Sequence, residues 1–340
     1  MIKIEDIAKL AGVSKSTVSL ALNGRNGVSE HKRQQILQIA KEKNYRPLRQ
    51  RKQNKITFSK SYIVRLVSCN DINRFTYNFQ NLPHFNELIT DFSTLSRKYP
   101  ITLLVNSISI NNIKKEFQDL ESYQKSDVII LLGTDLPEIV IKTINDLHDK
   151  LIIIDTCFFN MNNDFININN YLGAYQATEF LIHYGHKNIG YVKGKQRIKN
   201  FKERHRGFED ALRKNGLSTT DIPTLVFSAN LITTYPSTIK NRDLPTAYFC
   251  ENDALAISLI KTLQKLDISV PDEVSVVGFD NISEATVITP ELTTVDINRQ
   301  YMVRLALEKV ISVITEEKVT PTQTLINTKL IKRQSVKKRN

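Results

Sequence analysis

Apolar side chains recur at helical spacing in the first part of the chain. Those of the segment "IEDIAKLA" are Ile4, Ile7, Ala8 and Ala11. They occupy positions i, i+3, i+4 and i+7, which form one face of a helix, and Gly12 follows as a terminator. Ser14 is a good N-cap for a second helix, and a third helix is expected from Ser29 to a point just before Pro47. The pattern predicts three short helices.

The expected second helix has two unlike faces. The inward positions are Thr17, Val18, Ala21 and Leu22, and the outward positions are Lys15, Ser16, Ser19 and Leu20. Most outward side chains are short and polar, which suits a helix that lies in the major groove of DNA. In that position Lys15 and Ser16 would hydrogen-bond base edges or phosphates, and an exposed Leu20 would contact a thymine methyl group.

From Tyr62 onward, short β-branched runs alternate with helical patterns. The runs are "YIVRLVSC", "ITLLVN", "DVIILL", "KLIIID", "NIGYVK", "TAYFC" and "VSVVGF". Such alternation is typical of parallel sheets with crossover helices, so the sequence predicts an α/β core. A break at residues 158–165, "FFNMNNDF", divides the runs into two similar halves.

Polar residues collect at the carboxyl ends of these expected strands. They are Asn70, Asp71, Asp155, Asn252, Asp253 and Asp280. Ligands of doubly wound sheets bind at this edge, and Arg204, early in a helix, offers a planar cation to a hydroxyl-rich ligand there. Two structural alternatives stay open: Asp253 as the N-cap of the helix "ALAISLIKTLQKL", and Asp280 as a helix or turn cap.

The distribution of positive charge along the chain indicates a binding partner. The chain of 340 residues has a formal net charge of +12, and residues 1–60 hold 14 Lys and Arg against 4 Asp and Glu, which leaves only +2 for the rest. A basic excess confined to one small segment indicates a polyanion as partner, and with the helical pattern this indicates double-stranded DNA.

Several classes of protein do not fit the sequence. The start "MIKIEDIAKL" has no apolar signal core and no apolar run is long enough to span a bilayer, so a cytoplasmic protein without a membrane partner is expected. The 3 cysteines, Cys69, Cys157 and Cys250, are far apart and fit buried thiols better than disulfides or a metal site. Phosphate-loop, dinucleotide, zinc-protease and nucleophile-elbow motifs are missing, which argues against an enzyme and against a cofactor.

The segment "IEDIAKLAGVSKSTVSLALNGRNGVSEHKRQQILQIAKEKNYRP" resembles the helix-turn-helix headpiece of the lactose/galactose repressor (LacI/GalR) family. The resemblance implies that Lys15, Ser16 and Leu20 read bases, while Thr17, Ser19 and Asn23 fix the DNA backbone. Ser14 completes the expected set of DNA contacts in the headpiece. One departure is Lys3, which stands where the family commonly has a capping Thr, so the first helix is more weakly capped.

The linker departs further from the family. In the family, a short hinge helix after the proline places a leucine as a wedge in the minor groove, seven residues beyond that proline. In this chain the corresponding position in "RPLRQRKQNKITFSK" is Asn54. Weaker kinking of the DNA and more phosphate neutralisation are therefore expected. The basic contacts would be Arg49, Arg51 and Lys52. Leu48 or Ile56 as a substitute wedge, and residues 48–60 as a plain flexible linker, remain alternatives.

The remaining sequence resembles the effector domain of the same family, which is similar to periplasmic sugar-binding proteins. The matching segments are "YGHKNIGYVKG", "RHRGFEDALRKNG", "PTAYFCENDALAISLIKTLQKLDISVPDEVSVVGFDNI" and "TPELTTVD". The resemblance implies that Asp155, Arg204, Asn252 and Asp280 contact the effector. An aromatic ring often stacks on the sugar in such proteins. The candidates are Phe75, Tyr77, Phe79, Phe158 and Phe159, although a core position is the more frequent role for each of them.

The sequence thus predicts an α/β protein with a three-helix headpiece at 1–46, a basic hinge at 47–60 and a two-lobed core of parallel sheets at 61–340. The family implies that the chain crosses between lobes, the first lobe holding about 61–160 and 292–320 and the second about 161–291 and 321–335. The expected function is a homodimeric transcription regulator, most often a repressor in this family. It would bind a pseudo-palindromic operator under control of a carbohydrate-type effector. A solute-binding protein without regulatory DNA binding is the alternative.

Overall fold

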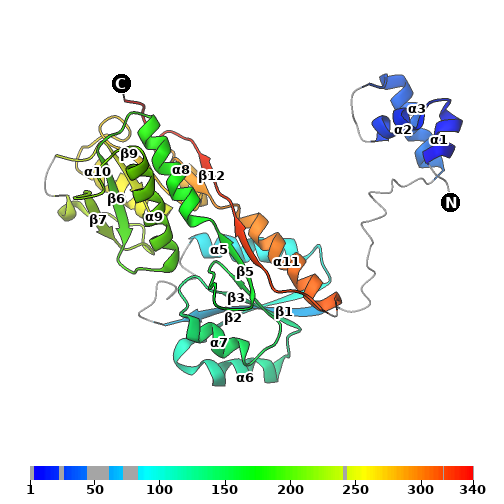
Figure 1. Cartoon of the computed structure of the whole chain (residues 1–340), viewed down its shortest axis with the longest axis horizontal. Helices are drawn as coiled ribbons and strands as arrows, with labels where there is room; N and C mark the ends of the chain where they lie inside the picture. The colour runs from blue at the N-terminus through cyan, green and yellow to red at the C-terminus, as the bar shows by residue number, and fades with distance from the viewer. Residues whose placement is uncertain are drawn as a thin grey trace. The chain divides into compact units, whose positions relative to one another are not determined.

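In the computed structural model of the chain, the described residues are 4–22, 27–43, 61–71, 83–239, 243–316 and 318–339. They divide into two compact units, residues 1–59 and 60–340 (Figure 1). Each unit has a hydrophobic core of its own. Within the described part of the chain, none of the helices combines the length and apolar character that crossing a bilayer requires.

The first unit contains the three helices that the spacing of apolar residues predicts. They are α1 (Ile4–Ala11), α2 (Lys15–Leu22) and α3 (Glu30–Glu42). Their buried side chains form one small core of Ile7, Ala8, Ala11, Val18, Ala21, Ile36 and Ala40. Gly12 has φ +60°, a conformation that disfavours side-chain-bearing residues and ends α1. The Ser14 hydroxyl accepts a hydrogen bond of 3.2 Å from the Thr17 amide and thereby caps α2 as expected.

The second unit begins with a six-stranded parallel sheet. Its strand order is β11-β5-β4-β3-β1-β2. The strands are β1 (Tyr62–Asn70), β2 (Ile101–Ser109), β3 (Val128–Leu132), β4 (Leu151–Ile154), β5 (Asp164–Ile168) and β11 (Gln323–Ile326). Every residue of β3 and β4 is buried, as in a sheet covered on both faces.

Within the described residues, four helices cover this sheet, and together with it they form what we call the first lobe. They are α5 (Pro83–Ser96), α6 (Ile113–Tyr123), α7 (Glu138–Asn145) and α11 (Arg299–Thr315). Helix α11 packs against α5 and contacts the central strands, while α6 and α7 pack together on the opposite face (Figure 1). A short 3₁₀ turn, Ile110–Asn112, joins β2 to α6.

The second lobe is built on a four-stranded parallel sheet of order β7-β6-β8-β9. Its strands are β6 (Ile189–Gly194), β7 (Thr224–Phe227), β8 (Ala247–Cys250) and β9 (Ser275–Val277), and its helices are α8 (Asn170–His183), α9 (Lys199–Lys214) and α10 (Asp253–Lys265). Two 3₁₀ turns, η3 (Pro236–Thr238) and η4 (Ser283–Thr286), complete it. The two lobes together confirm the predicted α/β core of parallel sheets.

The chain passes between the lobes at three places, after β5, after β10 (Thr294–Asp296) and between β11 and β12 (Lys329–Ile331), and β10 pairs antiparallel with β12. An asparagine marks each crossing. The Asn169 amide group donates 3.0 Å to the Asn327 side-chain oxygen, and the Asn298 amide group lies 3.4 Å from the Asn327 carbonyl. These hydrogen bonds hold the three crossing segments side by side.

The crossing points differ from the sequence-based boundaries. The sequence predicts that the break at 158–165 ends the first lobe, yet β5 pairs with β4 in the first sheet. The family pattern places the segment "QTLINTKLI" in the second lobe, yet its first half, Gln323–Ile326, pairs with β5 as the edge strand of the first sheet. Only its second half reaches β12. The reason is that strand partners are chosen by packing across the sheet, which the local sequence pattern does not contain.

Candidate functional site

The outward face of α2 is the candidate DNA interface of the first unit. Lys15 and Ser16 are exposed, whereas Thr17, Ser19 and Leu20 are half-buried. The helical pattern predicts an exposed Leu20. In the structure its Cδ1 lies so close to Gly27 that a Cβ atom at that glycine would be only 3.5 Å away, so part of the leucine side chain packs on the next segment. Ser14 is exposed beside its cap contacts with Ser16 and Thr17. The other predicted DNA contacts, namely Asn23, Arg49, Arg51 and Lys52, lie outside the described residues, as do Lys3, Leu48, Asn54 and Ile56.

Lys15 has an internal partner. Its Nζ lies 2.6 Å from Oε1 of Glu5 on α1, and both side chains are at least half exposed. An exposed ion pair of this kind contributes little to stability and is screened by salt. The Lys15 ammonium is therefore free to exchange the carboxylate for a phosphate or a base at small energetic cost.

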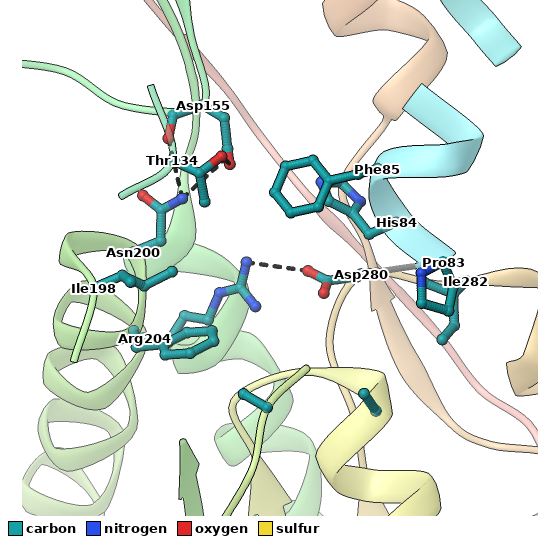
Figure 2. Close-up of a pocket in the computed structure, with 13 residues that line it drawn as sticks. Pro83, His84, Phe85, Thr134, Asp155, Ile198, Asn200, Arg204, Asp280 and Ile282 are labelled. Atoms are coloured by element: carbon teal, nitrogen blue, oxygen red, sulfur yellow. Dashed lines mark hydrogen bonds and ion pairs between the residues drawn. The ribbon is translucent and has the colours of Figure 1, made fainter. Parts of the chain in front are cut away.

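A cavity lies between the two lobes of the second unit (Figure 2). It encloses about 40 Å³ of free space, and we call it the cleft. The polar residues that line it are His84, Thr134, Asp155, Asn200, Arg204 and Asp280, and its apolar walls include Phe85, Ile198, Phe201 and Ile282. Asp155, Arg204 and Asp280 thus line one cavity; they are three of the four residues predicted from the sequence.

Arg204 is the most highly coordinated residue of the cleft. Its Nη2 lies 3.1 Å from Oδ1 of Asp280, its Nε donates to Oδ1 of Asn170 at 2.8 Å, and its Nη1 donates to the backbone oxygen of Glu251 at 2.5 Å. The guanidinium carbon lies 3.7 Å from the centre of the Phe279 ring, a cation–π contact. These contacts fix the plane of the guanidinium and leave its edge toward Asp280 at the cavity (Figure 2).

Asp155, directly after β4, connects the lobes. Its Oδ2 accepts a 2.5 Å hydrogen bond from the Thr134 hydroxyl within the first lobe. Its Oδ1 and backbone oxygen accept hydrogen bonds of 3.0 and 3.2 Å from the side-chain amide of Asn200 on α9, in the second lobe. Asp155 has φ +61°, a left-handed backbone conformation that is uncommon for a residue with a side chain and is often found at functional sites.

Burial controls the protonation of the cleft. It raises the pKa of Asp280 to about 6, against the stabilising charge of Arg204, and it also raises the pKa of Asp155. It lowers the pKa of His84 to about 4, so the imidazole is neutral at physiological pH. The Nδ1 atom of His84 is buried without a hydrogen-bond partner in the described part of the protein. The cleft therefore holds two carboxyl groups, one guanidinium and one neutral imidazole with an open hydrogen-bonding position.

Asn252 does not line this cavity. It is the N-cap of α10, where its side-chain oxygen accepts from the Leu255 amide at 2.9 Å, and its amide group donates to the Ala229 carbonyl at 2.9 Å. The N-cap role predicted for Asp253 therefore belongs to Asn252. Asp253 is fully buried instead, accepting from the Thr294 hydroxyl at 2.5 Å and the Ile282 amide at 2.9 Å. It joins α10 to β10 and η4.

The aromatic residues of the cleft also differ from the candidates. Phe158 and Phe159 do not line it; their rings lie 4.3 and 5.8 Å from Nζ of Lys199. Phe85 and Phe201 supply the aromatic walls instead. The candidates Phe75, Tyr77 and Phe79 lie outside the described residues.

Sequence reasoning missed three polar residues of the cleft, and the sequence contains a signal for two of them. Thr134 follows the strand β3, so the rule applied to strand ends includes it. Asn200 stands four residues before Arg204 on α9, hence on the same helix face. His84 lies in a segment whose departure from the family pattern concealed it, and nothing in the local sequence indicates that its Nδ1 is buried without a partner.

Comparisons with known proteins fit this geometry. The profile of "Bacterial regulatory proteins, lacI family" matches residues 3–47, and the profile of the "Periplasmic binding protein-like domain" matches residues 178–336. The repressor PurR of Histophilus somni is 28% identical over 344 residues, covering 99% of both chains. The probable repressor ExuR of Bacillus subtilis is also 28% identical, again over 99% of both chains.

Solved structures agree at the level of the fold. A complex of the regulator CelR with cellobiose has a TM-score of 0.69 at 21% identity and covers 98% of this chain and 100% of its own. The lac repressor dimer bound to operator and an anti-inducer has a TM-score of 0.68 at 18% identity, with 99% of each chain covered. At these identities the likeness establishes only the architecture, so the class of ligand has to be inferred from the residues of the cleft.

Proposed function

The chain belongs to the lacI family of bacterial regulatory proteins, and we propose that it is a transcriptional repressor. Binding of a neutral, hydroxyl-rich effector in the cleft determines whether the protein binds or releases its operator. The single observation that carries the effector assignment is the convergence of Asp155, Arg204 and Asp280 on one cavity between two lobes. Two copies of the chain would present two headpieces to the two half-sites of a pseudo-palindromic operator, because two-fold symmetry in the protein calls for it in the DNA.

In the headpiece, the proposed base contacts are Lys15, Ser16 and Leu20. The exposure of Lys15 and Ser16 on α2 supports this assignment, and the partly buried Leu20 retains an accessible apolar surface for a thymine methyl group. Ser14, Thr17 and Ser19 present hydroxyl groups beside them for phosphates.

The charge of the cleft supports a neutral effector. Asp155 and Asp280 outnumber the cation Arg204, and His84 is uncharged at physiological pH. An anionic ligand would therefore meet a net repulsive field in a poorly solvated space. Carboxylates and a guanidinium instead accept from and donate to sugar hydroxyls, and Phe85 and Phe201 offer apolar surface to the carbon side of a ring. Two structural neighbours, a regulator from Enterococcus faecium and CelR, hold ribose and cellobiose respectively, which is consistent with a sugar here.

Lobe movement links the two activities. The cavity of about 40 Å³ lies below the usual size of small-molecule sites, so binding of a sugar requires the lobes to separate. Separation breaks hydrogen bonds that cross the cleft, from Asn200 to Asp155 and from the Ser283 amide to Glu87 on α5 at 2.9 Å. An effector that replaces Asn200 on Asp155 stabilises one lobe arrangement over the other, which is the only way a ligand shifts such an equilibrium.

Thermal unfolding of the full chain against a panel of neutral sugars tests the effector assignment. A true effector at about 100 times its dissociation constant is expected to stabilise the protein by about 2.7 kcal/mol. Asp155→Asn should abolish the shift because the amide cannot accept two hydrogen bonds in the same geometry, whereas Asp149→Asn, at an exposed position of the same lobe, should keep it. A ligand that still stabilises Asp155→Asn fully would place the effector outside the cleft.

Replacement of Lys15 tests the DNA assignment. Lys15→Ala is expected to weaken binding to an operator selected from random DNA by roughly tenfold or more, because one charged contact to a base or phosphate is lost. Fluorescence anisotropy at a fixed salt concentration measures this effect. Lys9→Ala removes the same charge from an exposed position of α1 and serves as the control. Equal weakening by both variants would show that total charge, and not the face of α2, determines the affinity.

A further inference from the structure

A second cavity, larger than the cleft, lies against α9. It has a volume of about 420 Å³, and we call it the groove. Segments of both lobes and of their crossings line it: the loop after β4, the end of β5, the start of α8, one face of α9 and the edge strand β11. Its side chains include Phe159, Asn167, Asn170, Tyr171, Lys199, Glu203, Arg206 and Leu325. The volume is in the range of small-molecule sites.

Helix α9 separates the groove from the cleft. Lys199, Glu203 and Arg206 follow one another at i, i+4 and i+7 and line the groove. Asn200 and Arg204, one position after the first two, line the cleft. A displacement of α9 caused by a ligand in one cavity therefore moves residues of the other.

The groove carries an excess of positive charge. Its lining has two cations, Lys199 and Arg206, and one carboxylate, Glu203, which lies 2.8 Å from Nη2 of Arg206. The Lys199 ammonium donates to the Cys157 carbonyl and lies 4.3 Å from the centre of the Phe158 ring. Neither contact neutralises the ammonium, so Lys199 presents a full charge to a ligand that enters the groove.

Two further features describe the rest of the ligand. The side-chain oxygen of Asn167 is buried without a hydrogen-bond partner in the described part of the chain, and it would accept from a hydroxyl group. Phe159 is 86% exposed and Leu325 is 58% exposed, and both line the groove, where they form an apolar wall accessible to a ligand. A ring with hydroxyl groups on its edge and carbon atoms on its face fits this combination.

We propose that the groove is a second ligand site that binds a phosphorylated sugar, with the phosphate at Lys199, a hydroxyl group at Asn167 and the apolar face of the ring on Phe159. Its charge is opposite to that of the cleft, so the two cavities select different ligands. Asn170 lines the groove and holds Arg204 by a hydrogen bond of 2.8 Å to its Nε, which gives the second ligand a direct connection to the cleft.

Calorimetric titration of the full chain with glucose 6-phosphate and ribose 5-phosphate tests this assignment. Lys199→Met is expected to weaken binding roughly tenfold or more through loss of a charged hydrogen bond, and Phe159→Ala roughly threefold through loss of the apolar wall. Because Phe159 is almost wholly exposed, its replacement leaves the folded structure intact. Lys202→Met removes the same charge at an exposed position of α9 and should stay within about twofold of the unmodified protein. Asp155→Asn alters the cleft and reaches the groove only through α9, so it should weaken binding less than Lys199→Met does.

Three results would overturn the proposal. Absence of binding by both phosphorylated sugars excludes the ligand class. Loss of binding in Asp155→Asn with retention in Lys199→Met places the ligand in the cleft instead. Equal affinity for inorganic phosphate and for the two sugar phosphates shows that the groove recognises only an anion and that Asn167 and Phe159 contribute nothing.

Discussion

Replacement of Arg204 by methionine is expected to lower the free energy of unfolding by about 3–5 kcal/mol at pH 7 and to abolish the response to the effector. Arg204 is 4% exposed and faces Asp280, which is 8% exposed. Methionine keeps much of the apolar stem but leaves the Asp280 carboxylate buried without its counter-charge, and it also frees the oxygens of Asn170 and Glu251. Urea denaturation of the full chain, followed by circular dichroism, measures the loss.

The double variant Arg204→Met with Asp280→Asn is the matched control. With no carboxylate to be left unpaired, it should recover a substantial part of the lost stability, although it should not recover the ligand response. The loss in the single variant should also shrink at pH 5, because Asp280 then binds a proton and no longer needs a cation. If the double variant is no more stable than the single one, the cost arises from packing around Phe279 and not from the ion pair.

The second large effect is a pair of opposite pH dependences in the cleft. The carboxyl of Asp280 has a pKa of about 6 when folded and about 3.9 when unfolded, so the folded state binds the extra proton and stability falls as the pH rises from about 4 to 6. His84 has a pKa of about 4 when folded and about 6.5 when unfolded, so its contribution to stability rises from about pH 4 to 6.5. Each group accounts for about 3 kcal/mol over its full range of pH, with opposite sign.

Single replacements separate these terms. For each variant, the quantity of interest is its free energy of unfolding minus that of the unmodified protein. From pH 4.5 to pH 7 this difference is expected to rise by about 2 kcal/mol for Asp280→Asn and to fall by about 2 kcal/mol for His84→Gln. Urea denaturation at the two pH values gives both differences. In the double variant the two changes should nearly cancel. If both single variants shift in the same direction, one of the two groups is not titrating in the cleft as its burial requires.

The headpiece is the part of the protein that the sequence determines best. Its helices arise from contacts between residues a few positions apart, such as the apolar positions of α1 and the Ser14 cap on Thr17. A pattern with a period of 3.6 residues records such contacts directly. Leu20 is the exception, because its partial burial depends on the segment near Gly27, which belongs to the following turn.

The sequence also determined the edge of the sheet at which the cleft forms. Asp155 follows β4 of the first sheet and Asp280 comes shortly after β9 of the second, and within each sheet the parallel strands bring their carboxyl ends to one edge. That the two edges face each other across the cleft follows only from how the lobes pack. Arg204 belongs to a recognisable motif, and its partner Asp280 follows from shared location alone. The residue types that give the cleft its chemical character are therefore predictable from the sequence.

Tertiary structure decided the rest. The placement of β5 and β11 in the first sheet, the capping role of Asn252 and the position of Phe158 and Phe159 on Lys199 all depend on how the elements pack. The groove against α9 is of the same kind, since β5, β11 and α9 come from three separate stretches of the chain. Local sequence fixes the period and the residue types of each element, whereas pairing partners, burial and the pKa shifts that follow from burial arise only when those elements pack together.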